Sequence, residues 1–222
     1  MPFPRAIEAV VFDMDGLLID SEIVVRAAVT RAVARVGHDL PPEVFARSLG
    51  CSALQAMAVM MDHFGPDFPM DRYLEVEEDE IRQAMAAGVA LKAGVTELVG
   101  HIEARGLPFA LATSSSRASA EQHLTRHGLW DRFAATVGRE DVTRHKPNPD
   151  PYLEAARRLG LPPTACLALE DSHNGVRAAH AAGMMVVMVP DILEPTTEMH
   201  GLCVRIAADL HEVHRLVAAH PR

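Results

Sequence analysis

Short apolar runs alternate with helix-like segments along most of the chain. The apolar runs predict β-strands, and they lie at residues 9–12, 109–112, 135–137, 166–169 and 185–189. Because these runs are almost continuously apolar, we expect both faces of each strand to be buried. Segments with helical periodicity lie between them, at residues 95–105, 118–127, 151–159 and 175–182. This alternation predicts an α/β fold with a doubly wound parallel sheet.

One long segment interrupts the alternation between the first and second predicted strands. Residues 17–87 contain no convincing strand pattern, and their helix-like stretches lie at 21–36, 42–64 and 71–87. We therefore expect a core of residues 1–16 and 88–222 with an inserted helical subdomain at residues 17–87. Such an insert is typical of a lid that closes over a site and excludes bulk water.

Composition narrows the possible classes of partner. The chain has 222 residues, with 30 acidic and 21 basic side chains and a formal net charge of −9. This balance argues against nucleic-acid or anionic-membrane partners, which need a basic surface. The three cysteines form no C-x-x-C pair, and no apolar stretch is long enough to span a bilayer. We expect a soluble cytoplasmic protein, either a monomer or a weak homodimer.

Polar residues gather where the predicted strands end. Ligands of open α/β sheets bind beyond the carboxyl ends of the strands, so these residues are candidates for a site. They form four groups along the chain: Asp13 and Asp15, Thr113 to Ser116, Lys146, and Glu170 with Asp171. Taken alone, each group could be a helix cap or part of a solvated loop. A single functional site explains better why all four groups fall at the ends of predicted strands.

These residue types suit phosphoryl transfer through a covalent intermediate. Asp13 and Asp15 are two positions apart, so in extended backbone their side chains leave the same face. A carboxylate nucleophile would thus lie beside a carboxyl group that can exchange a proton. Lys146 would offset negative charge, and Thr113 with the backbone N–H groups that follow would bind phosphate oxygens. Clustered carboxylates favour a hard divalent cation such as Mg²⁺.

Four segments, read together, resemble the haloacid dehalogenase superfamily, and in particular its β-phosphoglucomutase-like and sugar-phosphatase group. The resemblance covers nearly the whole chain, in the right order, with the helical insert where that group has its cap. The matching segments are Val-Phe-Asp-Met-Asp-Gly at 11–16, Leu-Ala-Thr-Ser-Ser-Ser at 111–116, Lys-Pro-Asn-Pro-Asp-Pro at 146–151 and Leu-Glu-Asp-Ser-His-Asn-Gly at 169–175. The fold implied is a Rossmann-like core with an α-helical cap.

The resemblance also implies roles for individual residues. Asp13 would be the nucleophile that forms an aspartyl-phosphate, and Asp15 the general acid and base. Thr113, Ser114 and Lys146 would bind the transferring phosphate.

Two further sets of contacts are implied or suggested. Mg²⁺ would be held by Asp13, by the backbone carbonyl of Asp15 and by Asp171, with Glu170 as a ligand or beside the ligands. Ser115, Ser116 and Arg117 are candidates for contacts with the substrate.

Three other functions compete with a phosphatase. A receiver-type phospho-acceptor would lack Asp15, the late acidic pair and the insert, while a haloacid dehalogenase would need no metal. A β-phosphoglucomutase-type mutase needs a second anion site, yet residues 17–87 contain no lysine. In an ungapped comparison, Val25 and Ala53 stand at two polar mutase positions. We therefore expect Mg²⁺-dependent hydrolysis of a small phosphorylated metabolite, a sugar or polyol phosphate.

Overall fold

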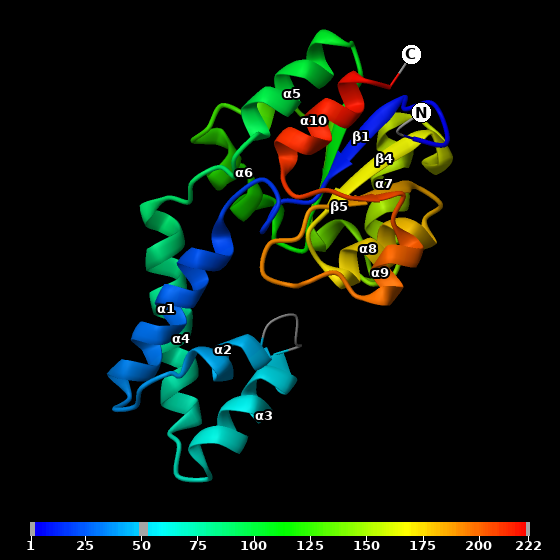
Figure 1. Cartoon of the computed structure of the whole chain (residues 1–222). Helices are drawn as coiled ribbons and strands as arrows, with labels where there is room; N and C mark the ends of the chain where they lie inside the picture. The colour runs from blue at the N-terminus through cyan, green and yellow to red at the C-terminus, as the bar shows by residue number, and fades with distance from the viewer. Residues whose placement is uncertain (1–2, 49–52, 221–222) are drawn as a thin grey trace. The chain divides into compact units, whose positions relative to one another are not determined.

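The computed structural model describes residues 3–48 and 53–220 (Figure 1). The chain divides into two compact units, one of residues 1–19 with 91–222 and the other of residues 20–90. The first unit contains the sheet, and the second is helical. In the described ranges, no helix combines the length and the apolarity needed to cross a bilayer.

A six-stranded parallel sheet forms the centre of the first unit. The strand order is β3-β2-β1-β4-β5-β6, so the chain winds outward in both directions from β1, as predicted. The short strand β6 was not expected from the sequence. The strands are β1 Ala9–Phe12, β2 Phe109–Ala112, β3 Ala135–Val137, β4 Cys166–Glu170, β5 Met185–Met188 and β6 Arg205–Ile206.

Helices cover both faces of this sheet, as Figure 1 shows for α5 and α10 on one face and α7 and α8 on the other. Strands β1, β2, β4 and β5 are buried at every residue because each face packs against side chains of a helical layer, whereas β3 and β6, at the two ends of the strand order, are partly exposed. Val11 belongs to a cluster with Tyr152 and Val176, whereas the ring of Phe12 packs edge-on against Phe109 and Phe133. The helices are α5 Val95–Ala104, α6 Arg117–Thr125, α7 Asp150–Leu159, α8 His173–Ala181, α9 Thr197–Leu202 and α10 Leu210–Ala218.

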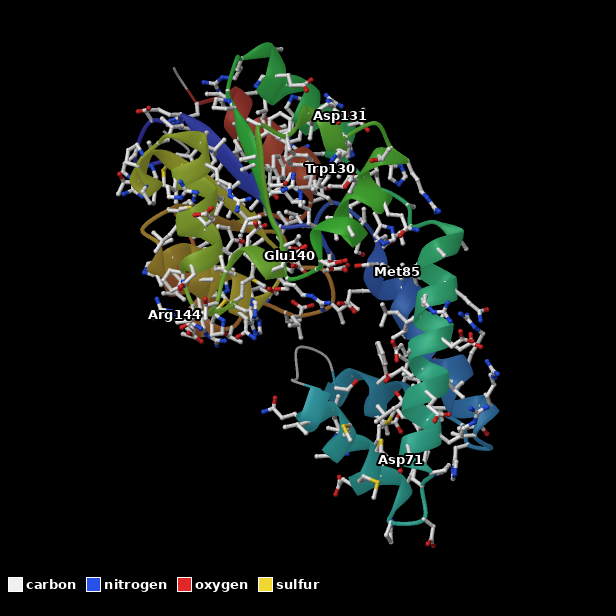
Figure 2. All side chains as sticks on the ribbon, turned by 180° about the vertical axis from the view of Figure 1, so that it is seen from behind. Asp71, Met85, Trp130, Asp131, Glu140 and Arg144 are labelled. Carbon is white, nitrogen blue, oxygen red and sulfur yellow. The ribbon has the colours of Figure 1, made fainter. Side chains whose placement is uncertain are left out.

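The described residues of the second unit form four helices around a small core of their own. Helix α1 (Ser21–Arg35) packs along α4 (Met70–Ala87), and the labels of Asp71 and Met85 in Figure 2 mark the two ends of α4. The stretch predicted as one helical segment at 42–64 contains α2 (Pro42–Ser48) and α3 (Ala53–Phe64). The core of this helical unit includes the buried side chains of Val29, Val33, Phe45, Met60, Phe68 and Val76.

The boundaries between the two units fall three residues later in the sequence than expected, after Ile19 and after Ala90. The backbone N–H groups of Leu17, Leu18 and Ile19 all bond to the carbonyl oxygen of Met14, at 3.3, 2.8 and 3.1 Å. Ile19 also forms an antiparallel bridge with Leu91. This tight turn keeps residues 17–19 with the sheet, so the division into units falls after Ile19 and not at residue 17.

Candidate active site

A buried lysine connects two of the predicted carboxylates at the carboxyl edge of the sheet. The Nζ atom of Lys146 lies 2.5 Å from Oδ1 of Asp13 and 2.6 Å from Oε1 of Glu170. Asp13 follows β1, and Glu170 ends β4, which pairs directly with β1. The Lys146 side chain is 6% exposed and that of Glu170 is fully buried. Parallel pairing of neighbouring strands therefore brings together residues that are 157 positions apart (170 − 13).

Glu170 is fixed by donors on several sides. Its Oε1 also accepts a hydrogen bond from the hydroxyl of Tyr152, at 2.6 Å, and its Oε2 accepts three bonds from the N–H groups of Asp171 and Ser172 and the Ser172 hydroxyl. Burial alone would raise the pKa of Glu170, but Lys146 and these donors hold that pKa below its usual value. Glu170 is therefore ionised and held in one orientation.

Tyr152 was missed by the sequence analysis. It is one of the two tyrosines of the chain, and it follows the Lys-Pro-Asn-Pro-Asp-Pro segment by one residue on α7. The side chain is fully buried in the sheet-facing core, and the Lys146 ammonium lies 5.1 Å from its ring centroid. An aromatic residue on the sheet-facing side of a helix is normally interpreted as a core residue. The position of Tyr152 in the sequence therefore gave no reason to expect its hydroxyl at the site.

Two glycines, which have no Cβ atom, make room for the carboxylates of Asp171 and Glu170. A Cβ atom at Gly16, where φ is +81°, would lie 2.2 Å from Oδ2 of Asp171. A Cβ atom at Gly175, in α8, would lie 1.7 Å from Oε1 of Glu170. Both approaches are far shorter than real Cβ contacts, so the sequence needs glycine at these two positions.

Asp171 completes an acidic group with Asp13 and Glu170. One oxygen from each of the three carboxylates lies within 4.8 Å of the other two. Burial raises the pKa of Asp171 well above its ordinary value, and repulsion from Asp13 and Glu170 adds to this effect. Burial likewise raises the pKa of Asp13 to about 8 despite the attraction of Lys146. Buried oxygen ligands that repel one another fit a hard divalent cation, so this group could hold a metal ion.

Asp15 lies outside this acidic group and contacts the loop after β2. The hydroxyl of Ser115 donates a hydrogen bond to Oδ2 of Asp15, at 2.7 Å. Thr113 is 3% exposed, its N–H bonds to the carbonyl oxygen of Val137, and its hydroxyl oxygen accepts the N–H of Ser115 at 3.0 Å. The two carboxylates of the Asp-x-Asp pair therefore have different partners, Lys146 for Asp13 and Ser115 for Asp15.

The remaining predicted residues lie on the loop after β2 and at the start of α6, and they have different contacts. Ser114 is exposed, and its contact with phosphate stays a prediction. Ser116 is the N-cap of α6, where its hydroxyl oxygen accepts the N–H of Ser119 at 3.2 Å. The guanidinium of Arg117 lies 5.9 Å from the ring centroid of Trp130, which is labelled in Figure 2. Ser116 and Arg117 thus have structural contacts of their own, and their contact with substrate stays a prediction.

Comparisons with known proteins agree on one family. The family model described as "Haloacid dehalogenase-like hydrolase" matches residues 10–189. Hexitol phosphatase B of Escherichia coli strain K12 is 35% identical over 198 residues, covering 86% of both chains. Protein CbbY of Rhodobacter capsulatus is 34% identical over 197 residues, covering 83% of this chain and 86% of its own.

The fold is also similar to that of solved structures. One is a HAD family hydrolase from Deinococcus radiodurans with bound phosphate and sodium, which is 29% identical, covers 93% of both chains and has a TM-score of 0.81. The match extends over nearly the whole chain, including the helical unit that interrupts the sheet.

Proposed function

The chain belongs to the haloacid dehalogenase-like hydrolase family and is a phosphoric monoester hydrolase, and we propose that it hydrolyses a small sugar or polyol phosphate through an aspartyl-phosphate on Asp13. The observation that carries this proposal is the contact of Lys146 with both Asp13 and Glu170, beside Asp171 and within the same sheet edge as Asp15.

Asp13 is the proposed nucleophile because it is held at the strand end by two fixed contacts. Its N–H bonds to the carbonyl oxygen of Leu169 at 3.0 Å, and its carboxylate meets Lys146. A carboxylate oxygen of Asp13 would attack phosphorus while the bond from phosphorus to the ester oxygen breaks. Lys146 would stabilise the negative charge on the phosphoryl oxygens, together with Thr113 and the N–H of Ser114.

Asp15 would supply and recover the proton. Its carboxyl group gives a proton to the ester oxygen, so the leaving group departs as an alcohol and Asp15 becomes ionised. Asp15 then takes a proton from the water that attacks phosphorus, which releases phosphate and restores the Asp13 carboxylate. One carboxyl group would thus act as acid and then as base.

The acidic group of Asp13, Glu170 and Asp171 would hold Mg²⁺, together with the backbone carbonyl of Asp15. The bound ion would supply electrostatic stabilisation for the oxygens of the transferring phosphoryl group. Because Glu170 already accepts hydrogen bonds at both oxygens, it would lie beside the ligands Asp13 and Asp171 and act mainly by fixing Lys146.

The helical unit favours hydrolysis over phosphomutase activity. Five of the six arginines in residues 17–87 form ion pairs, namely Arg31 and Arg35 with Glu80, Arg47 with Asp62, Arg72 with Glu75, and Arg82 with Asp79. A cavity of about 310 Å³ inside this unit is lined mostly by apolar side chains and by Glu22 and Glu77, and its described lining contains no lysine or arginine. Val25 is among the lining residues, whereas the Ala53 side chain lies outside the described residues. The described lining of this cavity therefore offers no cationic side chain for a second phosphate.

The central experiment measures phosphate release from hexitol, hexose and glycerol phosphates with Mg²⁺ and after chelation. We expect Mg²⁺-dependent release, and we expect Asp13→Asn to lower turnover by about 10⁴-fold or more, because an amide cannot form the covalent intermediate. Rapid acid quenching and mass spectrometry should find a phosphoryl group on the peptide that contains Asp13. A folded Asp13→Asn protein with normal turnover would overturn the mechanism.

A second assay separates phosphatase from mutase. The enzyme is given β-glucose 1-phosphate with a catalytic amount of glucose 1,6-bisphosphate, and both glucose 6-phosphate and free phosphate are measured. We expect free phosphate with little isomerisation. Fast formation of glucose 6-phosphate without free phosphate would favour the mutase.

A further inference from the structure

The hydroxyl of Ser115 already has a partner within the protein, the carboxyl group of Asp15. It donates a 2.7 Å hydrogen bond to Oδ2 of Asp15, across 100 positions of sequence. An ionised carboxylate only accepts hydrogen bonds, and a protonated one carries its single proton on one of its two oxygens. A donor fixed at Oδ2 therefore leaves Oδ1 as the oxygen that carries and transfers the proton.

The backbone around Ser115 is held independently of its hydroxyl. The Ser115 N–H donates to the Thr113 hydroxyl oxygen, and the Ser115 carbonyl accepts the N–H of Arg139, both at 3.0 Å. Two residues further along, the Arg117 N–H donates to Oε1 of Glu140, which is labelled in Figure 2, at 2.9 Å. These contacts fix the direction of the Ser115 side chain, and they remain when its hydroxyl is removed.

We infer that Ser115 is a positioning residue that orients the Asp15 carboxyl group for proton transfer, with Oδ2 bound to Ser115 and Oδ1 directed to the ester oxygen. This inference rests on the proposed role of Asp15 as general acid. When Asp15 gives its proton from Oδ1 to the departing ester oxygen, the Ser115 hydroxyl stabilises the carboxylate that forms. When Asp15 takes a proton from water, the same bond keeps Oδ1 in place to receive it.

The test compares two esters with different need for a general acid. A sugar or alkyl phosphate has a poor leaving group and needs a proton at the ester oxygen, whereas p-nitrophenolate leaves readily without one. The value of kcat/KM covers the steps up to release of the leaving group, so it isolates the acid step from later hydrolysis of the intermediate. An orienting role predicts a selective loss with the alkyl ester.

Ser115→Ala should lower kcat/KM for the alkyl phosphate by about tenfold to a hundredfold, as expected for loss of a hydrogen bond to a charged group, and should change p-nitrophenyl phosphate less than about threefold. The inhibition constant of inorganic phosphate should stay within about twofold, because Thr113 and Lys146 still bind it. Ser115→Thr keeps the hydroxyl and should restore most of the alkyl activity.

Two further variants keep the experiment decisive. Ser115→Cys preserves the size of the side chain but offers a much weaker donor, so it should reproduce Ser115→Ala if the latter folds poorly. Ser119→Ala removes a nearby hydroxyl of α6 that makes no side-chain bond among the described residues, and should leave both activities unchanged.

The results also distinguish this inference from the proposed function. If Asp15→Asn lowers both esters equally, the acid role of Asp15 itself is wrong. If Asp15→Asn is selective for the alkyl ester but Ser115→Ala and Ser115→Cys lower both equally, or mainly weaken phosphate inhibition, Ser115 contacts substrate and the orienting role is overturned.

Discussion

Replacing Gly175 with alanine should destabilise the protein, although alanine is the better helix former. Gly175 lies in the first turn of α8, where a Cβ atom would be 1.7 Å from Oε1 and 1.9 Å from Cδ of Glu170. Real Cβ contacts stay beyond 3.0 Å, so the carboxylate would have to move by at least 1.3 Å (3.0 − 1.7). That movement would break its bonds to Lys146 and Tyr152.

The two opposing effects can be compared in magnitude. Alanine in place of glycine within a helix gains up to about 1 kcal/mol. Disrupting a buried, hydrogen-bonded ion pair costs about 3–5 kcal/mol, because one charge is left without its partner. We therefore expect Gly175→Ala to lower the free energy of unfolding by about 2–4 kcal/mol, the difference between these values. Hydrolytic activity should fall as well, since Lys146 loses one of the carboxylates that hold it.

Gly100→Ala is the matched control. Gly100 lies inside α5, and a Cβ atom there would meet no atom within 4 Å. This change should raise the free energy of unfolding by about 0.5–1 kcal/mol with activity unchanged. Urea unfolding of both variants and of the parent, followed by circular dichroism, gives the comparison. Equal stability of the two variants, with full activity in Gly175→Ala, would refute the close approach of α8 to Glu170.

Two more predictions concern Tyr152, which is fully buried, and His101, which is half-buried. Tyr152→Phe removes the hydroxyl that donates to Glu170, so it should lower the free energy of unfolding by about 1–3 kcal/mol in urea titrations; an unchanged value would mean that this bond contributes nothing. Burial, together with the nearby charges of His214 and Arg105, lowers the pKa of His101 in the folded state. As the pH decreases through about 6.5, the unfolded chain therefore binds the proton first, and the free energy of unfolding should fall. The fall should be smaller in His101→Gln than in the control His200→Gln, which changes an exposed histidine, and parallel curves would contradict it.

The sheet and the main site could be predicted because their signals are local. A strand buried on both faces must be apolar along its length, and the polar residues after β1, β2 and β4 stand out against that background. The contact of Lys146 with Asp13 and Glu170 then follows from parallel pairing of β1 with β4 and from the connection before α7. The resemblance to a known family added the order of the motifs.

Other features depend on packing that a local pattern does not contain. Strand β6 has two residues, Arg205 and Ile206, and exists because it pairs with the edge of β5. The contact between Tyr152 and Glu170 requires that α7 lie across the sheet, so its spacing along the chain carries no sign of it. The position of the boundary between the units depends on three N–H groups that converge on Met14, which hydrophobic periodicity cannot reveal.

The charges at the sheet edge explain why folding and function place opposite demands on the same residues. Asp13, Glu170 and Asp171 carry three potential negative charges, and Lys146 supplies one positive charge between two of them. Burial and mutual repulsion therefore raise the pKa values of Asp13 and Asp171, which means that ionising them in the folded protein costs free energy. A divalent cation would offset the remaining charge and favour the ionised Asp13 that nucleophilic attack requires. The acidic cluster is thus least favourable for the protein alone, and a bound divalent cation would cancel the formal negative charge that Lys146 leaves unpaired.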